Sequence, residues 1–197
     1  MRSNGTKQQR ANHVVSAWSK EDGYCLGQKI VEEKSNEITA IPKLLEKIQI
    51  KGQVVTINAM RTQMAIVEQI RKKRADYVLA VKKNQGNLYE NITLYFGEEE
   101  KKRIKEEGNY KKTIEKAHGQ LEIREYYQSE DIKWLPNKKD WKGLKSIGVE
   151  EKSMYTEEGV KKEYRYYISS LKQDMELFAR AVRGHWSIGV SKICTGI

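Results

Sequence analysis

The first part of the chain alternates between short strand-like and longer helix-like apolar patterns. Residues 11–19 and 24–34 are rich in β-branched and apolar residues, and an Asp-Gly pair between them is a strong hairpin signal. Residues 35–48 then carry apolar side chains at helical spacing, and Pro42 inside this pattern predicts that the helix starts or kinks there. This part of the chain therefore predicts a β-hairpin followed by a helix.

A strand, a second helix and another strand follow. The β-branched run at 54–57 predicts a buried strand, residues 62–74 repeat at helical spacing, and residues 76–84 predict a second buried strand. Elements in this order predict a mixed α/β sheet with crossover connections. Asn58 comes directly after the first of these strands, where α/β proteins usually place their chemistry.

The rest of the chain is more polar and returns to strands before it ends in a helix. From residue 85 onward we predict a helix at 88–107, a strand at 114–127, a loop at 134–144, strands at 146–156 and 161–171, and a helix at 174–188. The last helix should direct Leu177, Ala181 and Val182 inward.

The chain carries an excess of positive charge. It contains 37 Lys and Arg against 27 Asp and Glu, so its net charge is +10. This excess favours a polyanionic partner such as nucleic acid, because neutralised phosphates release condensed counterions. A solvated surface of Lys and Glu explains the same composition, and charge alone does not decide between the two. The length of 197 residues predicts one main domain.

Neither a disulfide framework, a zinc site nor a membrane span is indicated. Cys25 and Cys194 lie far apart in the sequence, and neither belongs to a metal-ligand spacing. Apolar runs stay well short of the roughly 18 residues that a membrane span needs, and the first residues lack a signal-peptide core. We therefore expect a soluble, cytoplasmic protein with no membrane partner.

Five stretches of the sequence resemble, in order and spacing, the transposases of the ISAs1 type, also called H-repeat-associated proteins. They are EKSNEITAIPKLLEKI, VVTINAM, DYVLAVKKNQGNL, AHGQLEIREYY and ARAVRGHWSI, and the match runs from about Val14 to Ile188. The resemblance implies a DDE transposase with a ribonuclease H-like fold, which cleaves and joins DNA at insertion-sequence ends. In such enzymes three carboxylates hold two magnesium ions that clamp the reacting phosphodiester.

The sequence departs from this pattern at each carboxylate position. The resemblance places the first Asp upstream of Arg2, the second at position 58 and the third, a Glu, at position 189, whereas the chain has Asn58 and Gly189. An amide oxygen brings no charge and Gly brings no ligand, so we expect both positions to be catalytically inactive and no magnesium to bind. We also interpret the tail after Ile188 as the product of a frameshift.

The resemblance predicts a single incomplete ribonuclease H-like domain over residues 1–197. Its core should comprise a mixed sheet flanked by helices at about 11–84 and 165–188, with an α+β insertion at about 85–164 before the last helix. Because the first strand of that fold would precede Met1, we expect this strand to be missing and a central edge of the sheet to be open.

Seven residues are candidates for contact with DNA. They follow a buried strand, occupy the AHGQ stretch or lie on the last helix, and they are Lys82, Lys83, Asn84, His118, Arg183, His185 and Trp186. Those after the strand either meet a phosphate or form a solvated strand end. For His118 a turn is the alternative, and for Trp186 the alternative is core packing.

These departures lead to the hypothesis of a catalytically inactive, truncated transposase remnant. The alternative is a non-catalytic DNA-binding remnant that competes with intact transposase at insertion-sequence ends. A chain without function and an active enzyme are further alternatives, and a homo-oligomer remains open.

Overall fold

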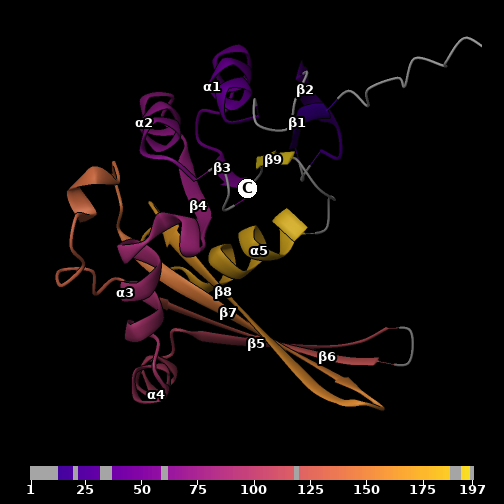
Figure 1. Cartoon of the computed structure of the whole chain (residues 1–197), viewed down its shortest axis with the longest axis vertical. Helices are drawn as coiled ribbons and strands as arrows, with labels where there is room; N and C mark the ends of the chain where they lie inside the picture. The colour runs from indigo at the N-terminus through magenta and orange to yellow at the C-terminus, as the bar shows by residue number, and fades with distance from the viewer. Residues whose placement is uncertain are drawn as a thin grey trace, which may run out of the picture.

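The computed structural model describes six stretches of the chain. These are residues 13–19, 22–31, 37–58, 62–117, 120–186 and 192–195. Together they form a nine-stranded mixed sheet with helices packed on both faces (Figure 1). The predicted α/β fold, a mixed sheet flanked by helices, is therefore confirmed.

Strands and helices alternate in the first half, and long strands dominate the second. The strands are β1 His13–Ser19, β2 Cys25–Val31, β3 Val54–Ile57, β4 Asp76–Val81, β5 Tyr110–Ala117, β6 Gln120–Ser129, β7 Ser146–Thr156, β8 Gly159–Ser169 and β9 Lys192–Thr195. The helices are α1 Glu37–Lys47, α2 Met64–Lys72, α3 Asn87–Tyr95, α4 Glu98–Glu106 and α5 Met175–Trp186, with short 3₁₀ turns η3 Lys83–Gln85 and η4 Lys138–Asp140. None of the described helices is long and apolar enough to cross a membrane.

The sheet has the strand order β2-β1-β9-β3-β4-β8-β7-β6-β5. β3 and β4 pair in parallel and are joined by α2, as the crossover pattern predicted. From β4 the sheet continues through an antiparallel meander, β8 to β5, whose long strands project away from the first half in Figure 1. Strands from the predicted core and from the predicted insertion at 85–164 belong to one continuous sheet, so the sheet itself marks no boundary between them. The division into a core and an insertion stays a prediction.

Three predicted elements differ in detail from the structure. α1 begins at Glu37, so the helix does not start at Pro42, which lies inside it. The helix predicted at 88–107 is two helices, α3 and α4, because Gly97 adopts an extended backbone (φ −65°, ψ 170°) directly before the first residue of α4. The strand predicted at 114–127 is a hairpin of β5 and β6. Side chains alternate with the same period of two residues in both strands, so the sequence pattern alone did not separate β5 from β6.

The helices divide between the two faces of the sheet. Buried residues of α1 to α4 join one large apolar cluster, and α5 packs on the opposite face in a smaller one. Ala181 and Val182 of α5 are buried, as predicted, and Leu177 is partly buried against the same cluster. Phe178, which the sequence pattern did not single out, is fully buried and packs edge-on against Tyr167 at a ring-centroid distance of 5.7 Å.

β9 lies in the middle of the sheet. It pairs in parallel with β1 and antiparallel with β3, and so occupies the position between these two strands. The prediction of an open central edge is therefore wrong. Unpaired backbone N–H and C=O groups in the centre of a sheet are costly. β9, whose residues show no clear strand pattern in the sequence, pairs with these groups of β1 and β3.

A side chain at Gly148 should disrupt the packing of α5 on the sheet. A Cβ atom at this position of β7 would lie 2.3 Å from Cζ of Phe178, which is fully buried. We expect Gly148→Ala to lower the free energy of unfolding by about 1 to 3 kcal/mol, as in other overpacked cores, in urea denaturation.

Gly97→Ala is the control, because its Cβ would meet only a carbonyl oxygen at 3.7 Å. It should change stability by about 1 kcal/mol or less. Equal effects of the two substitutions would contradict the close contact between β7 and α5.

Candidate functional site

The parallel pairing of β3 and β4 brings several polar residues to one edge of the sheet. Ile57 and Leu79 are partners in this register, so Asn58 follows the end of β3 near the point where β4 runs on to Val81. The residues Lys82 to Asn84 come directly after β4 and are exposed, whereas Asn58 is half-buried. We call the surface formed by Asn58, Thr62 and residues 82–85 the carboxyl edge.

Thr62 and Gln85 connect the two segments of this edge. The Thr62 hydroxyl donates a 2.9 Å hydrogen bond to the carbonyl of Ala80, and its side chain is buried. Gln85 donates through Nε2 to the carbonyl of Thr62 at 3.3 Å, and its Oε1 accepts the backbone N–H of Lys82 at 2.7 Å. The start of α2 is thus fixed to the end of β4.

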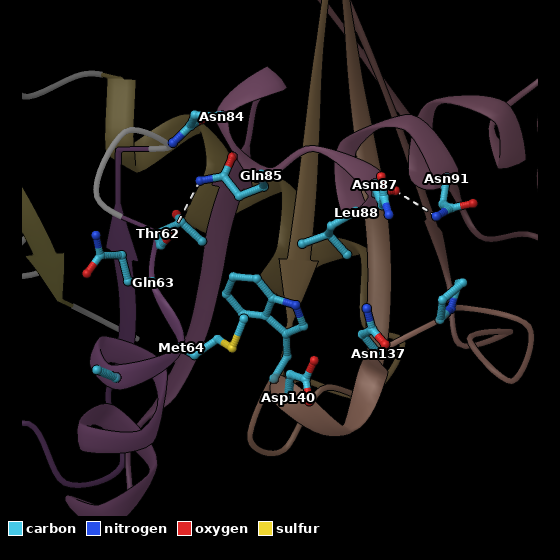
Figure 2. A pocket seen from close by; sticks show the side chains of 13 residues that line it. Thr62, Gln63, Met64, Asn84, Gln85, Asn87, Leu88, Asn91, Asn137 and Asp140 are labelled. Carbon is cyan, nitrogen blue, oxygen red and sulfur yellow. Dashed lines mark hydrogen bonds between the residues drawn. The ribbon is translucent and has the colours of Figure 1, made fainter.

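A pocket rich in amide side chains opens beside this connection (Figure 2). Its volume is about 600 Å³, and we call it the amide pocket. Its lining residues come from the start of α2, from η3 and α3, and from the loop around η4: Thr62, Gln63, Met64, Ala65, Asn84, Gln85, Asn87, Leu88, Asn91, Pro136, Asn137, Asp140 and Trp141. Amides both donate and accept hydrogen bonds, so such a lining suits a neutral polar ligand.

A second pocket of about 530 Å³ lies next to the amide pocket and is basic, and we call it the lysine pocket. It is lined by Lys82, Lys83, Arg165 and the rings of Tyr89 and Tyr164, together with Ala80, Val81 and Asn84. Asn84 borders both pockets. Two exposed lysines beside tyrosine rings form a surface that can attract a phosphate and pack against a base or a sugar.

Arg183 lies apart from these pockets. Its guanidinium forms ion pairs with Glu115 and, at 3.6 Å, with Glu122, so α5 is held against the β5–β6 hairpin. Burial alone would raise the pKa of the Glu122 carboxyl. The positive charges of Lys152 and Arg124 beside it have the opposite and larger combined effect, so the pKa of Glu122 lies below its usual range. Arg183 therefore already has two acidic partners, which compete with any phosphate.

Several predicted site residues cannot be placed. Gly189 and His118 lie outside the described residues. His185 and Trp186 belong to the last turn of α5, but their side chains lie outside the described part of the structure. The structure thus brings Lys82, Lys83 and Asn84 together with Asn58 at one edge, and it separates Arg183 from them.

The amide pocket was not predicted from the sequence. Its clearest signal is the run NQGNLYEN at 84–91, which contains four amide side chains in eight residues. Gln63 and Asn137 come from distant positions, and nothing in the local pattern connects them with this run.

The described donor atoms at the carboxyl edge do not fit a two-magnesium centre. Magnesium and calcium sites are built mainly from carboxylate oxygens, whereas the side chains here are amides, a hydroxyl and lysines. Asp140 is the one carboxylate among the lining residues of the amide pocket. Within the described residues, no three His, Cys, Asp or Glu side chains lie together as a metal-binding group.

Comparison with known proteins identifies the family. Residues 2–188 match the family described as "Transposase DDE domain". The chain is 42% identical over 192 residues to "Putative transposase YncI" of Escherichia coli O157:H7, covering 92% of this chain and 47% of that protein. It is 38% identical over 196 residues to "H repeat-associated putative transposase YhhI" of Escherichia coli strain K12, covering 93% of this chain and 49% of the relative.

The chain therefore belongs to the DDE transposase family, and its resemblance to the H-repeat-associated transposases is confirmed. A protein of Xanthobacter autotrophicus, "Uncharacterized protein in dhlA 3'region", is 36% identical over 161 residues, which cover 82% of this chain and 54% of that protein. The chain spans about half the length of these curated relatives. No solved structure matches it significantly.

The Thr62 hydroxyl should be necessary for the shape of the carboxyl edge. Thr62→Val removes the hydroxyl that donates a hydrogen bond to the buried carbonyl of Ala80. We expect a loss of about 1 to 3 kcal/mol in the free energy of unfolding, measured by urea denaturation.

Thr62→Ser keeps the hydroxyl and should recover most of this loss. If Val and Ser at position 62 gave the same stability, the hydrogen bond to Ala80 would not be what holds α2 to β4.

Proposed function

We propose that this chain is a DNA-binding transposase relative that does not cleave DNA. The observation that supports the absence of catalysis is Asn58, a neutral amide at the carboxyl end of β3, where the family resemblance implies an Asp. Family membership implies DNA binding. In this proposal the chain occupies insertion-sequence ends in the cytoplasm and competes there with intact transposase.

Charge at position 58 is the reason to expect inactivity. Two magnesium ions that clamp a phosphodiester need anionic ligands, because the ligands must compensate for their lost hydration. An amide oxygen in place of a carboxylate removes one full negative charge from the site. We therefore expect magnesium to bind weakly or not at all beside Asn58, and the rate of any cleavage to fall with it.

The lysine pocket and the amide pocket support the choice of DNA as the ligand. Lys82 and Lys83 are exposed on the same edge as the amide pocket, and the net charge of +10 favours a polyanion. A phosphate over the lysines would leave the adjoining nucleotide next to Asn84, which borders both pockets. Amide side chains can then bond to base edges. A homo-oligomer on paired DNA ends is compatible with this proposal.

Restoring the acidic residue at position 58 should not restore cleavage. We expect neither the natural chain nor Asn58→Asp to nick a DNA duplex that carries an insertion-sequence end, with magnesium or manganese present, because position 189 is Gly. Gel analysis of end-labelled DNA measures this outcome. Asn58→Ala serves as the matched control, and metal-dependent nicking by the natural chain or by Asn58→Asp, but not by Asn58→Ala, would contradict the proposal.

DNA affinity should depend on the lysines that follow β4. The double substitution Lys82→Ala/Lys83→Ala should weaken binding and reduce the slope of log affinity against log salt by about 0.9 for each phosphate that the protein no longer neutralises. Fluorescence anisotropy with a labelled duplex, repeated over a range of salt concentrations, gives this slope.

Lys47→Ala/Lys51→Ala is the control, because it makes the same change in charge at exposed positions near the opposite end of β3. Equal effects of the two pairs would mean that net charge alone binds DNA, without a site at the carboxyl edge.

A further inference from the structure

β5 is the last strand of the sheet, and among the described strands it has one neighbour, β6. Its pairing with β6 keeps a single register over all eight residues of β5, so no bulge bends the strand away. β5 also contains no proline. Bulges and prolines are two of the features by which proteins protect the open side of an edge strand. We call the side of β5 that faces away from β6 the β5 edge.

The ladder with β6 shows which backbone groups point to the β5 edge. In the same register, directly before β5, the backbone N–H of Gln128 donates to the carbonyl of Asn109 at 3.3 Å. Hydrogen-bonded and non-hydrogen-bonded pairs alternate in an antiparallel ladder, so every second residue of β5 from Lys111 onward bonds to β6. The residues between them direct N–H and C=O groups outward, and these are Tyr110, Lys112, Ile114 and Lys116.

Apolar side chains lie on one face of the meander and reach the β5 edge. Ile114 is the Cα partner of Ile123 in β6, and two residues further along the ladder Leu121, Tyr155 and Val160 form a row across β6, β7 and β8. Ile114 lies in the middle of β5, and 60% of its surface is exposed. A strand beside β5 would cover part of this surface, so the β5 edge offers apolar burial as well as backbone hydrogen bonds.

Two copies of β5 can pair antiparallel about a two-fold axis, and charge selects the register. If the axis passes through Thr113, Lys111 of each copy lies opposite the partner's Glu115, and no like charges face each other. With the axis at 111, 112, 115 or 116, a charged residue meets its own copy, and with the axis at 114, Lys112 meets the partner's Lys116. Like charges directly opposite are destabilising. The lysines of β5 therefore permit self-pairing in one register and oppose the others.

α5 adds to this charge pattern on its face of the sheet. Lys111 forms an ion pair with Glu176 of α5, and Glu115 forms one with Arg183. In the register centred on Thr113, charges of alternating sign would follow one another across the axis: Glu176, Lys111, the partner's Glu115 and the partner's Arg183. Because α5 already holds Lys111 and Glu115 on this face, their pairing across the axis costs less side-chain entropy.

We propose that the chain forms a two-fold symmetric dimer in which the β5 strands of two copies pair antiparallel, centred on Thr113. Lys112 pairs with the partner's Ile114 and Tyr110 with the partner's Lys116, and these residues exchange backbone hydrogen bonds across the axis. The aliphatic stem of Lys112 covers the partner's Ile114. The two sheets thus become one by strand addition. The dimer does not rest on DNA binding, and its tests contain no DNA.

A cysteine on the axis tests the register. Two copies of residue 113 form a non-hydrogen-bonded pair, whose Cα atoms lie about 4.5 Å apart, within disulfide range. We expect Thr113→Cys, combined with Cys25→Ser to remove the exposed free cysteine, to give a disulfide-linked dimer on a non-reducing gel after mild oxidation. The Cys25→Ser chain alone gives the background.

Lys116→Cys in the same Cys25→Ser chain is the matched control. The proposed register places the two copies of residue 116 six residues apart along the strands, about 20 Å, so this variant should not cross-link above background. Failure of position 113 to cross-link, or equal cross-linking at 113 and 116, would contradict the proposal.

The hydrogen bonds at the β5 edge can be weakened without a change in the ladder to β6. The N–H of Ile114 points outward, so Ile114→Pro removes one donor at the edge. We expect this substitution to raise the dissociation constant of the dimer at least about tenfold, or about 1.4 kcal/mol, in sedimentation equilibrium. Ile114→Thr is the control, because it keeps the N–H and a β-branched side chain, and it should dimerise nearly as well as the natural chain.

Two results of sedimentation would overturn the proposal. One is a natural chain that stays monomeric up to about 1 mM, where the free energy of association would be weaker than about 4 kcal/mol. The other is equal weakening by Ile114→Pro and Ile114→Thr, since apolar contact without strand pairing would then hold the dimer. Circular dichroism checks that the proline variant is folded. Because the cysteine variants contain no new proline, they test the proposal even if that variant does not fold.

Discussion

The pairing of β4 with β3 on one side and β8 on the other is the constraint on which the rest of the structure depends. β4 is buried along nearly its whole length and is the strand through which the first half of the sheet connects with the long meander. Its parallel pairing with β3 brings the ends of both strands to the same edge. Asn58 and Lys82 lie at the same edge of the sheet only because this register holds.

Charge decides what this edge can do. The same backbone arrangement would suit a metal centre if carboxylates stood at its strand ends, because hard divalent cations need anionic oxygens. Here the described side chains are amides, a hydroxyl and lysines, which are groups that can attract a phosphate and form neutral hydrogen bonds but do not suit a metal centre. The neutral residues Asn58 and Gly189 thus separate the proposed DNA-binding role from the catalytic role that the family resemblance implies.

The sequence predicted the elements with strong local patterns and missed those set by tertiary contacts. The β-branched run before Asn58 and the helical spacing after Thr62 were sufficient to predict β3 and α2. β9 could not be foreseen, because a four-residue tail segment forms a strand only when two neighbours offer unpaired edges. In the candidate site, Lys82 to Asn84 follow a predictable strand, whereas the approach of Asn137 and Gln63 depends on how distant loops fold together.

The most direct test of the central claim is a manganese titration of the natural chain, followed by nuclear magnetic resonance. Manganese broadens the signals of nearby residues, so the backbone signal of Asn58 reports whether ions gather at the carboxyl edge. The account predicts no selective, saturable broadening around Asn58 in a chain that still binds DNA. Saturable broadening centred on Asn58, with two ions bound per chain, would contradict it.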